Sequence, residues 1–215
     1  MLNLNKAGEQ AFIFSGQVAD FEAILSVPPD YDKRYIVLLG HPHSLQGGTM
    51  HNKVVTTLAR VFKELGMASV RFNFRGVGQS QGEYAAGVGE SEDMLLLAEL
   101  CQQQMPGVRL VFAGFSFGSY VTYRAAAKCP HALLVSIAPP VHHYDYTEYD
   151  PAPHPWMIVQ GDADEVVPVD EVRTFVAQSV FPLVYLEMAD TSHFFHGKLV
   201  ELKSLLLQRI QTLGL

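Results

Sequence analysis

The chain has 215 residues, of which 48% are hydrophobic and 17% charged, and its formal net charge at pH 7 is −7. This length fits one domain covering residues 1–215, and the apolar content excludes a disordered or fibrous protein. The acidic balance repels phosphate backbones and anionic membranes, so neither nucleic acid nor a membrane surface is expected as a partner.

The first segments predict an antiparallel hairpin, because apolar and polar residues alternate at 12–15 and 21–25 around Gly16. After the hairpin, short β-rich apolar runs alternate with longer stretches of helical period. Strands are predicted at residues 35–39, 69–74, 110–113, 133–137, 157–160 and 183–188. Helices are predicted at 53–64, 91–103, 117–128, 170–178 and 198–212. This alternation predicts an α/β fold, a doubly wound, mostly parallel sheet covered on both faces.

Two further features of the chain limit its architecture and location. Residues 139–155, rich in Pro, His and Tyr, are too few for a helical lid domain, so we expect any lid to be a loop. Cys101 and Cys129 fall within predicted helices, which fits two reduced thiols better than a framework of disulfide bonds. The start of the chain lacks the features of a signal peptide and no apolar run is long enough to span a membrane, so we expect a cytoplasmic protein, either a monomer or a homodimer.

The sequence GFSFG at residues 114–118 follows a predicted strand and begins a predicted helix. A serine on such a sharp strand-to-helix turn is exposed at the carboxyl edge of the sheet, and the small flanking residues avoid backbone clashes. The helix start offers N–H groups to a developing oxyanion. We therefore predict that Ser116 is a nucleophile and that the Phe117 N–H is one oxyanion donor.

A serine nucleophile needs a base, and the base needs a carboxylate that fixes its tautomer. The segment GDADEVVP at 161–168 follows one later strand, and we predict Asp164 as the acid. Asp162 is the alternative, with a turn-capping role as its simpler interpretation. Two more acids there are expected to face solvent or cap the next helix: Glu165 and Asp170.

The base is sought after the last predicted strand, where the sequence reads ADTSHFFH at 189–196. We predict His193, because it lies in the loop just past the strand. His196 is the second choice, because it adjoins the final helix. The order serine, acid, histidine, each at a strand end, is the one that sheet hydrolases use.

The loop after the first parallel strand, GHPHSLQGGTM at 40–50, is expected to supply the second oxyanion donor. Pro42 has no N–H, which leaves His43 or Ser44, and we favour His43. His41 and His43 also suggest a metal site, but a third convincing ligand is missing, and no metal is expected.

The glycine-rich stretch RGVGQSQG at 75–82 resembles a dinucleotide fingerprint only superficially. Gln81 occupies the place of the third glycine, and the stretch follows a middle strand rather than the first. We therefore expect a tight connection beside the site and no cofactor. Ser80 is a second serine nearby, but it lacks the small flanking residues of a nucleophile turn.

With these residues in place, the chain resembles the α/β-hydrolase superfamily, and within it a group of small bacterial predicted hydrolases. The resemblance is carried by HPHSLQGGTMHNKVV, RFNFRGVGQSQGEY, GFSFGS, GDADEVVP and SHFF, and it covers about residues 35 to 197. It implies the α/β-hydrolase fold without a lid domain and a serine hydrolase with Ser116, Asp164 and His193 at the matching positions. Two departures fall near the mouth of the site: Ser44 stands for proline and His51 for an acidic residue.

Three functions are compatible with these motifs. The first is an esterase acting on a small-molecule acyl substrate, and the second is a thioesterase, peptidase or amidase with the same residues. The third is a binding module on an idle hydrolase fold. Pocket shape decides among the leaving groups. Candidate pocket residues are Phe115, Phe117, His142, His143, Tyr144 and Tyr146.

Overall fold

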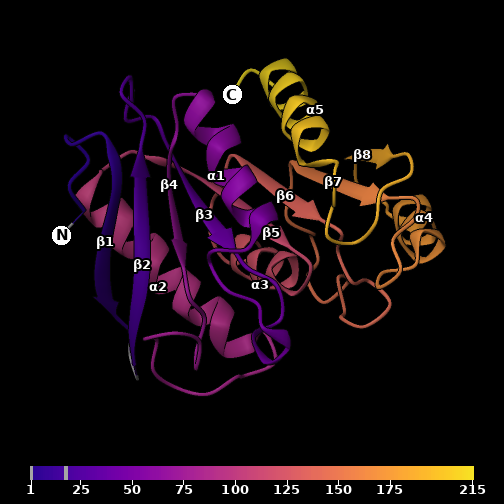
Figure 1. The fold of residues 1–215 in the computed structure, drawn as a ribbon, viewed down its shortest axis with the longest axis horizontal. Helices are drawn as coiled ribbons and strands as arrows, with labels where there is room; N and C mark the ends of the chain where they lie inside the picture. Colours follow the sequence, from indigo (N-terminus) through magenta and orange to yellow (C-terminus); the bar gives the residue numbers. More distant parts are fainter. Residues whose placement is uncertain (1, 17–18) are drawn as a thin grey trace.

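The structure is a computed structural model and describes residues 2–16 and 19–215. Within these residues eight strands form one sheet, in the order β1-β2-β4-β3-β5-β6-β7-β8 (Figure 1). The strands are β1 (Gly8–Ser15), β2 (Asp20–Val27), β3 (Tyr35–Gly40), β4 (Ala68–Phe72), β5 (Arg109–Phe115), β6 (Leu133–Ile137), β7 (Trp156–Gly161) and β8 (Leu183–Met188). The helices are η1 (Ser44–Gln46, a 3₁₀ turn), α1 (Lys53–Glu64), α2 (Val88–Gln104), α3 (Phe117–Ala126), α4 (Val169–Gln178) and α5 (Leu199–Thr212).

The sheet combines an antiparallel edge with a parallel centre. β1 pairs antiparallel with β2, and β2 pairs antiparallel with β4, whereas the pairs from β4 through β8 are parallel. The predicted α/β fold with an N-terminal antiparallel hairpin is thus confirmed. Residues 17 and 18 of the predicted hairpin turn lie outside the described part of the chain.

The chain changes direction across the sheet at β3. From β3 it passes through α1 to β4 on one side, and from β4 it returns through α2 to β5 on the other side of β3. Loops that leave β3 and β5 at their carboxyl ends therefore diverge, and open α/β sheets bind ligands at such a point. The residues predicted to be functional all follow strands at this edge.

The two faces of the sheet carry separate hydrophobic cores. Val37 and Leu39 pack with α1 and α5, whereas Ile36 and Leu38 pack with α2, α3 and α4. Figure 1 shows α1 and α2 on opposite faces of the sheet. All residues of β3 are buried, because alternate side chains enter opposite cores. This explains why the central strands read as continuous apolar runs.

Several boundaries differ from the prediction. β1 and β2 are longer than expected, because the backbone pairing continues past the alternating apolar residues to Gly8 in β1 and to Val27 in β2. α2 begins at Val88, three residues early, because the Glu90 carboxylate accepts the Gly87 N–H at 2.8 Å and starts the helix there. Cys129 lies beyond α3, which ends at Ala126, so the expectation that it is helical was wrong.

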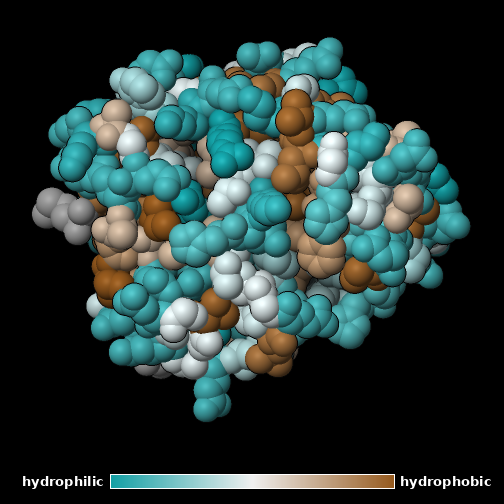
Figure 2. Space-filling view, viewed as in Figure 1, coloured by the Kyte–Doolittle hydropathy of each residue, from teal (hydrophilic) through white to brown (hydrophobic). Residues whose placement is uncertain are grey.

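No helix of the described residues combines the length and the apolar character needed to cross a membrane. Figure 2, in the orientation of Figure 1, shows hydrophobic residues scattered in small groups among hydrophilic ones on this face of the molecule.

Candidate active site

Ser116 occupies the turn between β5 and α3 in a backbone conformation that serine rarely adopts, with φ 52° and ψ −125°. Hydrogen bonds hold this turn from both sides. The Ser116 N–H donates to the Ile137 carbonyl at 2.9 Å, and the Ser116 carbonyl accepts the Ser119 N–H at 2.8 Å. The Ser119 hydroxyl donates to the same carbonyl at 2.6 Å. The side chain of Ser116 is thereby fixed at the carboxyl edge of the sheet.

The flanking glycines are required by close backbone packing. A β-carbon on Gly114 would lie 2.2 Å from the Gly118 carbonyl oxygen and 2.6 Å from the Ser119 nitrogen. Real β-carbons do not approach other atoms so closely, so any larger residue at 114 displaces the first turn of α3. The GFSFG motif is therefore explained by local sterics.

His193 lies in the loop after β8 and joins the other two predicted residues. Its Nε2 atom is 3.1 Å from Ser116 Oγ, and its Nδ1 atom is 2.9 Å from Asp164 Oδ2. The residue is only 2% exposed, and its ring lies against Phe115, with centroids 5.0 Å apart. Residues 77 and 29 positions apart in the sequence thus form one continuous hydrogen-bonded chain.

The Asp164 carboxylate is fully buried and accepts four hydrogen bonds. Oδ1 accepts the N–H groups of Val166 and Val167 at 2.9 and 2.7 Å, and Oδ2 accepts from Gln160 Nε2 at 3.0 Å in addition to His193. Burial alone raises the pKa of Asp164, but the bonds from His193 and the two valine amides outweigh it and lower that pKa. The carboxylate is therefore ionised at neutral pH.

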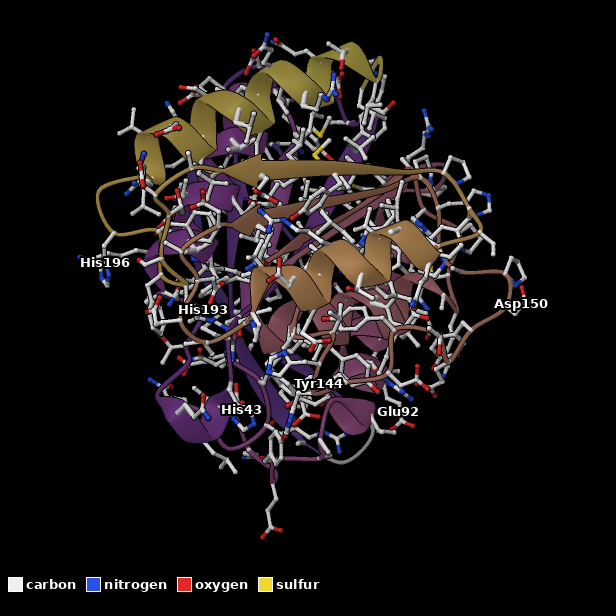
Figure 3. The ribbon with its side chains drawn as sticks, turned by 90° about the vertical axis from the view of Figure 1, so that its right-hand side faces the viewer. His43, Glu92, Tyr144, Asp150, His193 and His196 are labelled. Carbon is white, nitrogen blue, oxygen red and sulfur yellow. The ribbon has the colours of Figure 1, made fainter. Side chains whose placement is uncertain are left out.

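The alternative residues lie elsewhere. Asp162 is exposed, and Asp170 pairs with Arg173 on the surface of α4 at 2.7 Å. His196 is also exposed. Figure 3 shows it projecting outward from the ribbon, whereas His193, His43 and Tyr144 lie on loops at one edge of the sheet.

The loop after β3 brings His43 beside the turn that carries Ser116. The His43 ring lies 5.0 Å from the Phe117 ring and 4.9 Å from the Tyr84 ring. Its Nδ1 atom accepts the Leu45 N–H at 3.3 Å and so caps η1, which begins at Ser44. The two residues predicted to supply oxyanion donors are therefore neighbours. Burial lowers the pKa of His43, as does nearby His143.

His41 has a structural role in the same loop. Its ring is completely buried and stacks on Phe74 at 4.0 Å. Nδ1 is 2.7 Å from the Pro42 carbonyl and Nε2 accepts the Phe74 N–H at 2.9 Å, so Nδ1 carries the proton. Burial lowers the pKa of His41 to about 4. Both ring nitrogens thus join the loop to the segment after β4.

Ser80, the second serine, is likewise engaged. It is 6% exposed, its hydroxyl donates to the Asn73 carbonyl at 2.7 Å, and it accepts the Glu22 N–H at 3.1 Å. These bonds fasten the glycine-rich stretch to β2. The stretch thus forms a tight connection between β4 and α2, with its backbone held at Gly76, Val77, Ser80 and Gln81.

The aromatic candidates separate into buried and exposed residues. Phe115 and Phe117 are buried, while His142 and His143 are exposed. Tyr146 is 2% exposed, and its hydroxyl is 2.7 Å from Ser119 Oγ beneath the nucleophile turn. The remaining one, half-buried Tyr144, stacks on Tyr120 with centroids 4.5 Å apart, and its hydroxyl lies 3.5 Å from that of Tyr84.

Sequence reasoning missed two residues that contact the predicted site. Gln160, fully buried, donates to Asp164 and also to the Val167 carbonyl at 3.1 Å. The sequence does mark Gln160, because it is a lone amide at the end of the apolar strand WMIVQG. Glu165, expected to face solvent or cap a helix, is exposed but accepts the backbone N–H of His193 at 3.0 Å. No local pattern identifies that contact.

Three comparisons show which known proteins this chain is similar to. The family described as "Serine aminopeptidase, S33" matches residues 33–153. An alpha-beta serine hydrolase homologue from Coxiella burnetii is 44% identical, with a TM-score of 0.90 over 93% of this chain and 96% of that one. A serine hydrolase described as being without a lid, from Xanthomonas campestris, is 39% identical, with a TM-score of 0.92 over 98% of this chain and 97% of that one. An uncharacterized protein of Rickettsia prowazekii is 36% identical over 176 residues, 77% of this chain and 74% of that protein.

Proposed function

This chain belongs to the α/β serine hydrolase family, and on that premise we propose that it is a carboxylesterase-like enzyme with Ser116, His193 and Asp164 as its catalytic triad. The observation that carries the proposal is the continuous chain of contacts from Ser116 Oγ through the imidazole to Asp164, at 3.1 and 2.9 Å. Nucleophile, base and orienting acid are within hydrogen-bond reach of one another, as covalent catalysis needs.

In the proposed acylation step, the Ser116 hydroxyl attacks the carbonyl carbon of an ester. His193 Nε2 takes the hydroxyl proton during the attack, and Asp164 stabilises the imidazolium through Nδ1. The same proton then passes to the alcohol oxygen as the ester bond breaks. An acyl group is left on Ser116.

In deacylation, a water molecule takes the place of the alcohol. His193 removes its proton as it attacks the acyl carbonyl, and returns that proton to Ser116 Oγ when the acid leaves. The Phe117 and His43 N–H groups are proposed to bind the oxyanion in both steps. Loss of one such donor typically costs about 3 kcal/mol of transition-state stabilisation.

The proposed substrates are small or flexible acyl compounds. Residues 139–155, too few for a helical lid domain, form turns without a helix or strand in this chain. The side chains of His43 and Tyr144, which lie against the Phe117 ring next to Ser116, belong to loops. A site of this kind suits a substrate that needs no deep enclosure.

The proposal is tested with p-nitrophenyl acetate and butyrate, beside labelling by a fluorophosphonate, which reacts with activated serines. We expect wild-type protein to hydrolyse the esters and to be labelled, and Ser116→Ala to do neither while keeping its circular dichroism spectrum. Folded wild-type protein that is not labelled would rule the proposal out.

A peptidase is the second candidate, because the matching family is described as serine aminopeptidases. Its triad would be the same, with an amine as the leaving group. Aminoacyl p-nitroanilides separate the two: faster turnover of these than of the esters favours a peptidase. Ligand binding that Ser116→Ala leaves intact, with no turnover of any substrate, indicates a binding module.

A further inference from the structure

A hydrogen bond from the His193 main chain to Glu165 joins two loops that are distant in the sequence. The backbone N–H of His193 donates to Glu165 Oε2 at 3.0 Å, across 28 residues. Glu165 follows Asp164 directly, so two consecutive carboxylates hold the same histidine. Asp164 holds its ring, and Glu165 holds its backbone.

The bond continues a pairing that begins at the ends of β7 and β8. The Asp162 N–H donates to the Met188 carbonyl at 3.1 Å, and the Ala163 N–H donates to the Thr191 carbonyl at 3.2 Å. A β-carbon on Gly161 would lie 2.2 Å from the Thr191 oxygen, so the two backbones are in direct contact. These contacts fix the second loop as far as residue 191. The Glu165 bond extends the attachment to residue 193.

We propose that Glu165 is a positioning residue that sets the backbone of His193, and through it the approach of Nε2 to Ser116. The inference rests on the proposed triad. A shift of the His193 backbone moves the ring with it, and Nε2 stands at 3.1 Å from Ser116 Oγ, where small displacements matter. Misplacement of a catalytic group by about 1 Å can lower a rate on the order of a hundredfold.

The bond is strong enough for this role because a carboxylate acceptor forms shorter and stronger hydrogen bonds with an N–H than a neutral oxygen does. Glu165 is exposed, however, so water competes for the carboxylate. The effect of removing it is therefore expected to be moderate. Its expected signature is a lower kcat with little change in KM, since the proposed role of Glu165 is to position the base and not to bind the substrate.

The experiment compares Glu165→Ala and Glu165→Gln with Asp162→Ala. Gln keeps a side-chain oxygen that accepts the His193 N–H, while Ala removes the acceptor. Asp162 is a matched control, an exposed carboxylate in the same loop that loses the same charge. We expect Glu165→Ala to lower kcat on the order of tenfold with KM within about twofold, Glu165→Gln to recover most of that loss, and Asp162→Ala to behave as wild type.

A second measurement monitors the hydrogen bond between the His193 N–H and Glu165 without relying on activity. Amide hydrogen exchange of the segment 189–197 is expected to rise in Glu165→Ala and to stay near the wild-type rate in Glu165→Gln and Asp162→Ala. Unchanged exchange in Glu165→Ala, a kcat within twofold of wild type, or a Gln variant no better than Ala would each overturn the role of Glu165. Failure of the wild-type protein to be labelled at Ser116 would instead overturn the proposed function, so the two failures are distinct.

Discussion

A β-carbon placed on Gly118 would lie 2.3 Å from the carbonyl carbon of Gly40 and 2.4 Å from its oxygen. The first turn of α3 therefore runs in direct backbone contact with the end of β3. This contact fixes the nucleophile turn relative to the loop that carries His43. Both parts of the proposed oxyanion site are thus set by the packing of two glycines.

Gly118→Ala is predicted to separate these backbones. The added methyl group has no free space, so we expect a loss of about 3 kcal/mol in the free energy of unfolding and loss of fluorophosphonate labelling. Gly107→Ala is the control, because a β-carbon there meets nothing within 4 Å and only its φ of 87° is unfavourable. That variant is expected to lose about 1 kcal/mol and to label normally. If the two variants had the same free energy of unfolding and the same fluorophosphonate labelling, the close contact at Gly118 would be contradicted.

Asp164→Asn is predicted to remove activity by reversing the imidazole tautomer. Asp164 Oδ1 accepts the N–H groups of Val166 and Val167. Its Oδ2 accepts from His193 and from Gln160. If the Asn oxygen keeps the two valine amides, its NH₂ group faces His193 Nδ1, which must then be an acceptor. Nε2 then carries the proton and no longer serves as a base for Ser116.

We expect kcat to fall by about 10⁴-fold in Asp164→Asn, with the protein still folded. Ester turnover and circular dichroism measure the two quantities. Asp162→Asn, an exposed change of the same kind, serves as the control and is expected to keep full activity. Loss of activity in both variants would show that charge in this loop, rather than the tautomer, is decisive.

Central elements of the fold were predictable because their burial leaves a clear pattern. The helix at residues 53–64 and the strand at 133–137 have the predicted bounds. The edge hairpin was predicted too short, because pairing between β1 and β2 extends over polar residues that hydrophobicity does not mark. Backbone hydrogen bonds determine those ends.

The same distinction between local pattern and long-range contact holds for the residues of the candidate site. Ser116 was predicted from local sterics, and Asp164 and His193 were predicted from their places after strands. The structure brings these three side chains together. Gln160 and Glu165 contact these residues only because the loops after β7 and β8 lie together. Such contacts depend on the relative placement of distant segments, which a single sequence does not encode in any local pattern.

Tyr146→Phe is predicted to weaken the support beneath the nucleophile turn. The Tyr146 hydroxyl is buried and lies 2.7 Å from Ser119 Oγ, which itself donates to the Ser116 carbonyl. Removing the Tyr146 hydroxyl leaves the buried Ser119 hydroxyl with one partner fewer, so we expect the free energy of unfolding in urea to fall by about 1 kcal/mol.

Tyr149→Phe is the comparison, because the buried Tyr149 hydroxyl has no hydrogen-bond partner in the described residues. Its stability is expected to stay within about 0.5 kcal/mol of wild type. An equal loss in both would assign the effect to packing rather than to the hydrogen bond.

His41 is predicted to make the stability of the protein depend on pH. Burial lowers its pKa from 6.5 to about 4, so the folded protein keeps the ring neutral where the unfolded chain has already bound a proton. The stability from this residue is complete above pH 6.5 and is lost as the pH falls toward 4, by about 3 kcal/mol in total. His43 and His131, whose pKa values burial also lowers, act in the same direction.

Comparison with His41→Gln isolates the contribution of His41. Gln does not titrate and keeps one donor and one acceptor for the Pro42 carbonyl and the Phe74 N–H. Its absolute stability is expected to be lower, but the change in stability between about pH 7.5 and about pH 4.5 is expected to be smaller than in wild type by about 2 kcal/mol. Urea unfolding at the two pH values measures this difference. The contributions of His43 and His131 to the pH dependence cancel in the comparison, because both proteins retain these residues. Equal pH dependence in the two proteins would mean that His41 gains a proton in the folded state as readily as in the unfolded chain, which its burial against Phe74 should prevent.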